Sequence, residues 1–320
     1  MGNIEQTLIE SIQKIVPEEA KSALVQGLNS IFSSLDEEQI NGFRKAFSEQ
    51  GKEWGFQSSH PVATEILLQL VGKVIGIIPL GGKEHAVGAL NNINDGKTVV
   101  MVGNHLSYGD VNFLHAQCEL NGIGKLPLLV MAGPKVYEEP FRILSSMAFD
   151  SLKMAQPPSK ASEGAEVSRR ELLQITRLVV EDAIKWQDNG RILYFFPEGT
   201  RTRTGELNSF IHGVSRYIER EGTLIYPVGY TGTDGLVGVD SNDINFSNAQ
   251  MNFGAPIDYD QTVAKIKAKY PEANVKKFMV DLLGFHIADL IEKENRGYYQ
   301  FPYNKNPDLR EVEEFYLTER

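Results

Sequence analysis

The stretch that most constrains the fold is Thr98–Asp110, TVVMVGNHLSYGD. It begins with an apolar run typical of a buried strand and continues into a polar turn that carries His105 and Asp110. Five helical steps of about 100° would place these two side chains roughly 140° apart, so they can meet only if the backbone turns between them. Such a turn is favoured by Gly103, Asn104, Ser107 and Gly109. The spacing therefore predicts a site at a strand end, in which the carboxylate orients the imidazole.

Composition excludes several classes of protein. The 320 residues are 42% hydrophobic and 23% charged, which is typical of a globular protein with a substantial core. The net charge of −10 argues against a nucleic-acid-binding protein but allows a local basic pocket for a small anion. The single cysteine, Cys118, excludes an intramolecular disulfide and a cysteine-based zinc cluster.

No apolar run has the length needed to span a bilayer. The longest, Ile66–Pro79, is interrupted by Gln69 and Lys73. We expect it to be a core helix, with a membrane-contacting surface as the alternative. The first residues, MGNIEQT, do not show the basic-then-apolar pattern of a leader, and Gln6 stands where a myristoylation signal needs Ser or Thr, so we expect neither signal here. A mature form from which a transit peptide has been removed is the open alternative.

The N-terminal part of the chain has helical periodicity. Residues 4–50 are predicted to be helical, with Ile4, Leu8, Ile12 and Ile15 on one stripe. The following segment, 51–62, is rich in Gly and Ser and is typical of a domain boundary. We therefore predict a small helical bundle over residues 1–58 and a second domain over 59–320.

The second domain is predicted to alternate strands with helices. Strands are expected at 98–103, 126–132, 191–196, 223–229 and 251–253, and helices at 63–78, 110–120, 139–148, 167–186, 213–220, 263–269 and 275–294. Residues 151–166 are expected to be a loop. Continuous apolar strands that alternate with helices indicate an α/β fold, with a mostly parallel central sheet flanked by helices.

A second polar cluster, FFPEGTRTRTGEL, follows the predicted strand 191–196. Arg201 and Arg203 stand among Gly and Thr residues, and guanidinium groups together with exposed backbone N–H groups suit phosphate oxygens. Glu198 could receive a substrate hydroxyl or hold Arg201 in place. The alternative is a solvated loop with a surface ion pair. Because ligands of such sheets bind outside the carboxyl ends of the strands, we expect this cluster and His105 to share one rim.

Together these blocks resemble the glycerolipid acyltransferases. The run His105–Asp110 matches their His-x4-Asp block, and Phe196–Arg201 is similar to their F-P-E-G-T-R block. Between them, Met131–Val136 is similar to the second block of the soluble plastid-type glycerol-3-phosphate enzymes, and Leu224–Val228 resembles the fourth block. The blocks occur in the family order. Thr202–Gly205, TRTG, is similar to the continuation of the third block in glycerol-3-phosphate acyltransferases.

The chain also departs from both branches of that family. The plastid enzymes do not keep the Glu-Gly-Thr portion of the third block, which this chain has. In the lysophosphatidate branch the third block is followed by Phe-Lys-x-Gly, whereas here Phe210–Gly213 reads Phe-Ile-His-Gly. His212 could serve a phosphate in place of that lysine, or it could be a surface or helix-start histidine.

The resemblance implies direct acyl transfer to a hydroxyl of glycerol 3-phosphate, the first step of phospholipid synthesis. His105 would be the general base oriented by Asp110, and the substrate would be bound by Glu198, Gly199, Thr200, Arg201, Arg203, Lys135 and His212. Arg142 is a further anion candidate. A covalent intermediate on Ser107 or Cys118 is the less favoured route, because Ser107 lacks a nucleophile-elbow context and Cys118 falls in a predicted helix. The alternatives are a lysophosphatidate or lysophospholipid acyltransferase, a lipid-binding protein without turnover, and a thioester hydrolase.

The expected partners follow from that reaction. They are a small phosphate-bearing acceptor, acyl-CoA or acyl-carrier protein as co-substrate, and a membrane surface contacted peripherally. We expect no separate cofactor, no metal and no nucleic acid. The implied location is the cytoplasm or the plastid stroma, with peripheral membrane association.

Overall fold

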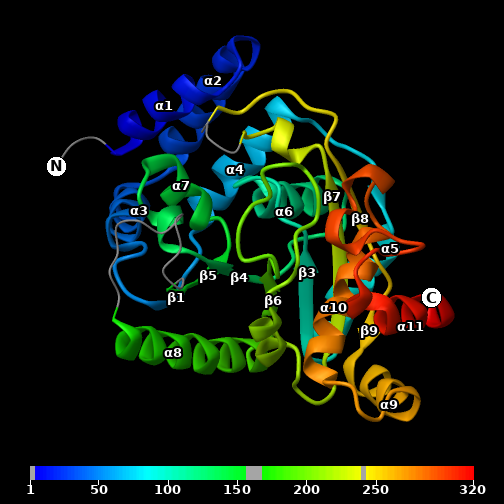
Figure 1. Ribbon diagram of the computed structural model, residues 1–320. Coiled ribbons are helices and arrows are strands. Elements are labelled where there is room, and N and C mark those ends of the chain that lie inside the picture. Colours follow the sequence, from blue (N-terminus) through cyan, green and yellow to red (C-terminus); the bar gives the residue numbers. More distant parts are fainter. Residues whose placement is uncertain (1–3, 156–167, 239–242) are drawn as a thin grey trace.

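A single twisted sheet forms the centre of the molecule (Figure 1). The structure, a computed structural model, describes residues 4–155, 168–238 and 243–320. The helices are α1 (Ile4–Ile15), α2 (Glu18–Ser34), α3 (Glu37–Glu49), α4 (Pro61–Val74), α5 (Lys83–Asn94), α6 (Asp110–Leu120), α7 (Pro140–Ser146), α8 (Arg169–Asp188), α9 (Tyr259–Lys269), α10 (Val275–Ala288) and α11 (Arg310–Glu319). The strands are β1 (Gly55–Gln57), β2 (Leu80–Gly81), β3 (Val99–Gly103), β4 (Leu128–Ala132), β5 (Asp150–Lys153), β6 (Ile192–Phe195), β7 (Leu224–Thr231), β8 (Gln250–Phe253) and β9 (Ile257–Asp258).

The sheet is mostly parallel, as predicted. Its order is β1-β5-β4-β6-β3-β7-β8-β2, with β9 paired to β7 outside this path. The five strands from β5 to β7 are all parallel, and antiparallel pairing is confined to β1 with β5 and to β7 with β8 and β9. The parallel centre brings the carboxyl ends of β3, β4 and β6 to one edge, and both polar clusters begin there.

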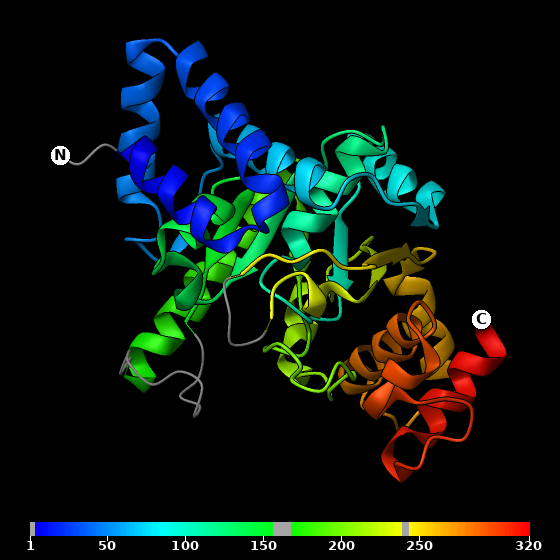
Figure 2. The same cartoon turned by 90° about the horizontal axis from the view of Figure 1, so that it is seen from above.

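Helices cover both faces of the sheet and divide the core in two. One hydrophobic cluster contains the buried faces of α1, α2 and α4 to α6, together with the residues of β3 and β4 that point to that side, such as Met101 and Val130. The other contains α8, α10 and α11, together with Val102 and Leu129 from the opposite face of the same strands. Figure 2 shows the blue N-terminal helices and the orange and red C-terminal helices on opposite sides of the sheet. This layering confirms the predicted α/β class.

The N-terminal helices pack directly on the sheet domain. Leu8 and Leu24, from α1 and α2, are buried in the same cluster as Leu67 and Leu70 of α4. The start of α3 is capped by Asp36, whose carboxylate accepts from the backbone of Gln39 in a capping box. The proposed division of the chain at residue 58 stays a prediction.

Several local predictions were wrong. The expected loop 151–166 overlaps β5, whose sequence DSLK is too short and polar to signal a strand. Strand β1 lies within the segment 51–62, where no strand was expected. The pairing of β5 with β4 and β1 makes it a strand, so tertiary context overrides its weak propensity. The remainder of that predicted loop, 156–166, lies outside the described residues. Helices α5 and α11 were not predicted, the helix expected over 275–294 ends at Ala288, and that expected over 213–220 is a 3-10 helix, η2 (His212–Tyr217).

Candidate active site

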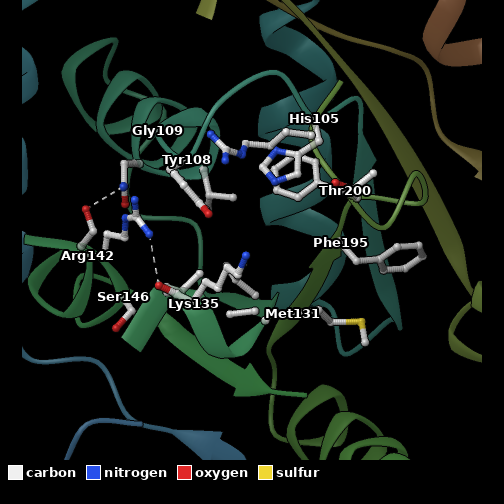
Figure 3. A pocket seen from close by; sticks show the side chains of 18 of the residues that line it. His105, Tyr108, Gly109, Met131, Lys135, Arg142, Ser146, Phe195 and Thr200 are labelled. Atoms are coloured by element: carbon white, nitrogen blue, oxygen red, sulfur yellow. Dashed lines mark hydrogen bonds between the residues drawn. The ribbon is translucent and has the colours of Figure 1, made fainter. Parts of the chain in front are cut away.

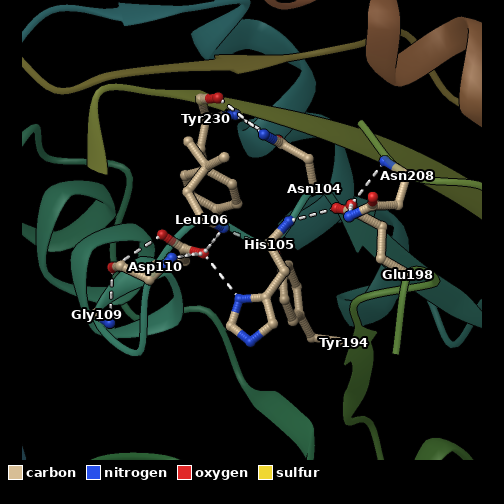
Figure 4. A network of polar contacts seen from close by, with 10 residues as sticks. Asn104, His105, Leu106, Gly109, Asp110, Tyr194, Glu198, Asn208 and Tyr230 are labelled. Atoms are coloured by element: carbon tan, nitrogen blue, oxygen red, sulfur yellow. Dashed lines mark hydrogen bonds and ion pairs between the residues drawn. The ribbon is translucent and has the colours of Figure 1, made fainter. Parts of the chain in front are cut away.

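The turn after β3 brings His105 and Asp110 together. The strand ends at Gly103, the backbone turns, and Asp110 is the first residue of α6. His105 Nδ1 lies 2.9 Å from Asp110 Oδ2. The same oxygen accepts from the backbone N–H groups of Leu106 (2.8 Å) and Ser107 (3.0 Å), and Oδ1 accepts from Ser107 Oγ (3.2 Å). The fully buried carboxylate is therefore fixed by the turn, and it holds the imidazole through Nδ1 (Figure 4).

The main chain of His105 is held on both sides. Its N–H donates to Glu198 Oε1 at 2.8 Å, and its carbonyl accepts from the N–H of Thr202 at 2.8 Å. The imidazole stacks on Phe196, with 3.8 Å between ring centroids and 8° between planes. These contacts leave Nε2 as the ring nitrogen that points away from Asp110 in Figure 4. An imidazole held through Nδ1–H by a carboxylate presents Nε2 as a proton acceptor.

Asn104, the residue before His105, was predicted only as a residue that favours the turn. Its Oδ1 accepts from the N–H of Tyr230 at 2.7 Å, and its Nδ2 donates to the Tyr230 carbonyl at 2.9 Å. The buried amide thus ties the end of β3 to β7, beyond the last ladder pair of the two strands. The available signal was a polar residue next to an apolar strand, which does not distinguish a tie of this kind from a solvated turn residue.

His105 opens onto a cavity of about 650 Å³ at the carboxyl edge of the strands. Five cationic side chains line it: Lys135, Arg142, Arg201, Arg203 and Arg216. No Asp or Glu of the described ranges lines it. Although the chain has a net charge of −10, the charged side chains around this cavity are therefore cationic, which suits an anionic ligand. Figure 3 shows His105, Tyr108, Lys135 and Arg142 around this space.

Most of the remaining cavity wall is apolar and comes from both faces of the sheet, with Asn112, Ser145, Ser146 and Thr176 as polar exceptions. One part comes from α4, α6 and the segment after β7, with Leu70, Val74 and Val237 as examples. The other part belongs to the opposite core and includes Phe195, Leu172 and Met154. Apolar walls next to a cationic centre suit a ligand with a hydrocarbon chain and an anionic group.

Five of the residues predicted to bind substrate line the cavity: Lys135, Gly199, Thr200, Arg201 and Arg203. Arg216, which also lines it, was missed because it was assigned to an ordinary helix. Gly199 has a φ of +69°, and a Cβ there would lie 2.3 Å from Ile211 Cδ1, so this turn after β6 favours glycine. The binding roles of these residues stay predictions.

The structure gives Glu198 a different place from the predicted one. It does not line the cavity, and its side chain is buried. Besides the His105 N–H, its carboxylate accepts from the backbone N–H and the Nδ2 of Asn208, both at 2.9 Å. Burial raises the pKa of Glu198 to about 7 in spite of these donors. Glu198 therefore supports the main chain of His105 and does not face a substrate.

His212 also lies apart from the cavity lining. Its Nε2 is 3.3 Å from both carboxylate oxygens of Asp281 on α10. Asp281 also accepts from the Tyr299 hydroxyl at 3.1 Å, and burial raises the pKa of its carboxyl group. The structure therefore places His212 next to Asp281, and its predicted contact with a phosphate stays a prediction.

The two candidate nucleophiles are both buried. Ser107 has no exposed surface, and its hydroxyl bonds Asp110 and the N–H of Gly109. Burial raises the pKa of the Cys118 thiol to about 12. Neither side chain lines the cavity, so the geometry supports direct transfer over a covalent intermediate.

Comparison with known proteins agrees with this geometry. Residues 85–231 match the family model described as Acyltransferase. These residues belong to the acyltransferase family. The match confirms the resemblance drawn from the sequence blocks, and the segment contains the His105–Asp110 turn and the arginine cluster. No curated protein matches the chain.

A solved structure similar to this chain is the 1-acyl-sn-glycerophosphate acyltransferase PlsC from Thermotoga maritima. The two are 16% identical, with a TM-score of 0.41, and the alignment covers 87% of this chain and 89% of the other. In the part of the chain that the structure describes, no helix is both long and apolar enough to cross a bilayer. The same ranges contain no group of three or more His, Cys, Asp or Glu side chains placed to hold a metal ion.

Proposed function

We propose that this acyltransferase moves a fatty acyl group from acyl-CoA or an acyl-carrier protein to a hydroxyl of glycerol 3-phosphate. The observation that carries the proposal is that one cavity contains the free edge of the His105 imidazole, five cationic side chains and apolar walls. A base, an anion-binding cluster and an acyl-binding wall are the three elements that this transfer needs.

The chemical step follows from the orientation of His105. The acceptor hydroxyl gives its proton to Nε2 while its oxygen attacks the thioester carbonyl carbon. Asp110 stabilises the imidazolium that forms, since its carboxylate contacts Nδ1 at 2.9 Å. The tetrahedral oxyanion then collapses, the carbon–sulfur bond breaks, and the thiolate leaves with the proton from the imidazolium. No cofactor or metal takes part in this scheme.

The cationic side chains supply binding and orientation. The phosphate of the acceptor is held by Arg201 with other cations of the lining, and this fixes the position of the hydroxyl. Such positioning converts a bimolecular encounter into a step within one complex, an effect of several orders of magnitude. The apolar walls receive the acyl chain, and the product leaves to a membrane surface that the protein contacts peripherally.

A second candidate acceptor is lysophosphatidate. The observation that favours it is the extension of the apolar wall over both faces of the sheet, because such an acceptor brings a second hydrocarbon chain. The sequence TRTG at 202–205 and the absence of a lysine in Phe210–Gly213 favour glycerol 3-phosphate.

A panel of acceptors tests the proposal. Acyl-CoA and acyl-carrier protein are each supplied with glycerol 3-phosphate, 1-acylglycerol 3-phosphate or glycerol, and free thiol and acylated products are measured. We expect thiol release to require glycerol 3-phosphate and to equal the amount of acylated product. Turnover with the acylated acceptor alone would favour lysophosphatidate. Thiol release without any acceptor would indicate a hydrolase, and acceptor binding without turnover would indicate a lipid-binding protein.

A further inference from the structure

Tyr108 lies in the turn between the proposed base and its carboxylate, and two guanidinium groups lie over its ring. The Cζ atom of Arg201 is 3.7 Å from the ring centroid, and that of Arg142 is 4.3 Å from the same centroid. Both distances are well within the range of a cation–π interaction. All three side chains line the cavity. Figure 3 shows Tyr108 and Arg142 next to each other in its wall.

These three residues come from different strand ends. Tyr108 follows β3, Arg142 is in α7 after β4, and Arg201 follows β6. Since both Cζ atoms lie close to the centroid of the Tyr108 ring, the distance between them cannot exceed the sum of their distances to that centroid. An anion bound next to both guanidinium groups would be attracted by two positive charges at once.

The two arginines on the ring also differ from the other cations of the cavity. Arg142 and Arg201 are partly buried, whereas Lys135, Arg203 and Arg216 are exposed. Cation–π contacts are stronger where the cation is desolvated, and charge-assisted bonds to an anion are stronger there too. A partly buried pair of guanidinium groups is therefore better suited to hold one phosphate in a fixed place than the three exposed side chains.

We propose that Tyr108 is a positioning residue that gathers Arg142 and Arg201 into one binding site for the acceptor phosphate. The proposal rests on the proposed function, because it takes a phosphate-bearing acceptor as the ligand. It adds Arg142 to the phosphate site. It also links that site to the base, because the turn that orients Tyr108 is the one that joins His105 to Asp110.

The test compares Tyr108→Phe with Tyr108→Leu. Phenylalanine keeps the aromatic face, so we expect the KM for glycerol 3-phosphate to change less than threefold. Leucine removes that face, and we expect this KM to rise roughly tenfold, while kcat and the KM for the thioester stay within about threefold. In the Leu background, Arg142→Gln should have a smaller effect than in the wild type, because the two changes disturb one site.

A binding measurement separates this proposal from the proposed function. Calorimetric titration with glycerol 3-phosphate, and separately with inorganic phosphate, needs no turnover. We expect weaker binding of both probes in Tyr108→Leu and unchanged binding in Tyr108→Phe. Lack of acyl transfer in the wild type would overturn the proposed function and leave this difference intact.

A matched control removes a cation–ring contact outside the cavity. Lys269 Nζ lies 5.4 Å from the ring centroid of Tyr270, so Tyr270→Leu should leave both KM values unchanged. The proposal is overturned if Tyr108→Leu keeps the wild-type acceptor KM. It is also overturned if Tyr108→Phe is as impaired as Tyr108→Leu, or if the thioester KM rises as much as the acceptor KM.

Discussion

Two histidine–carboxylate pairs of the described residues, His105 with Asp110 and His212 with Asp281, differ in what the imidazole faces. In the first, His105 contacts Asp110 through Nδ1 at 2.9 Å, stacks on Phe196 and lines the cationic cavity. In the second, His212 contacts Asp281 through Nε2 at 3.3 Å and lies outside the cavity lining. The His212 side chain is 46% exposed and that of His105 is 17% exposed.

The difference indicates that pairing with a carboxylate does not by itself orient a histidine toward the cavity. The carboxylate of the first pair is held by backbone N–H groups of its own turn, so the imidazole has a fixed orientation and its free nitrogen faces the ligand space. The carboxylate of the second pair holds the Tyr299 hydroxyl as well, and that pair connects η2 to the C-terminal helices. In the proposed mechanism the first arrangement serves proton transfer, whereas the second has a packing role.

Replacing each histidine should separate the two pairs most strongly. We expect His105→Ala to lower kcat by roughly 10³-fold or more, because the base is lost, while acceptor binding stays largely intact. His212→Ala should change kcat by less than about threefold. Steady-state kinetics with calorimetric binding measures both. Equal losses in the two variants would contradict the distinction.

The carboxylates provide the next test. Asp110→Asn places an amide N–H2 among groups that donate to the carboxylate, so the imidazole loses its orientation and kcat should fall by roughly 10²-fold or more. Asp281→Asn should lower the free energy of unfolding by about 1–3 kcal/mol and leave kcat unchanged. Kinetics and denaturant unfolding of both variants decide this, and a catalytic defect confined to Asp281→Asn would reverse the assignment.

The two pairs also show which contacts could be predicted from the sequence and which could not. The strand-to-turn pattern at 98–110 is local, so it predicted both the fold position and the meeting of His105 with Asp110. Glu198 and His212 stand in equally polar surroundings, but the direction in which each side chain points depends on Asn208 and α10. The contacts of Tyr108 and Asn104 were not predicted, because their partners lie 34 or more residues away in the sequence. Local chemistry is visible in the sequence, whereas long-range pairing is not.

The buried carboxyl group of Glu198, which holds the main chain of His105, can be tested through the pH dependence of the free energy of unfolding. Burial raises the pKa of Glu198 from 4.5 to about 7, so between these values the folded chain keeps a proton that the unfolded chain has released. The contribution of Glu198 to the free energy of unfolding should therefore fall as the pH rises from 4.5 to about 7, by at most about 3 kcal/mol. We expect Glu198→Gln to lack this fall and to lose activity several-fold.

Denaturant unfolding at several pH values between about 4.5 and 7.5 measures this effect. The Asp281→Asn variant is a suitable control, because it removes a different buried carboxylate and should leave the contribution of Glu198 in place. An identical pH slope in the wild type and Glu198→Gln would show that Glu198 does not titrate in this range.

The smallest expected effect concerns the ring that supports His105. Phe196→Leu removes the stacking partner but keeps an apolar side chain, and aromatic pairs contribute about 0.5–1.5 kcal/mol beyond their area. We expect kcat to fall by roughly threefold to tenfold without a change in the acceptor KM. Steady-state kinetics over a range of acceptor concentrations measures both values. A rise in KM with unchanged kcat would mean that Phe196 contacts the acceptor instead.

A crystal structure of the protein with glycerol 3-phosphate bound tests most directly whether His105 and the two arginines contact the same acceptor. We predict that the phosphate contacts Arg142 and Arg201 and that one acceptor hydroxyl lies about 2.6–3.2 Å from His105 Nε2. A phosphate bound away from these two arginines, or a hydroxyl out of reach of His105, would contradict the account.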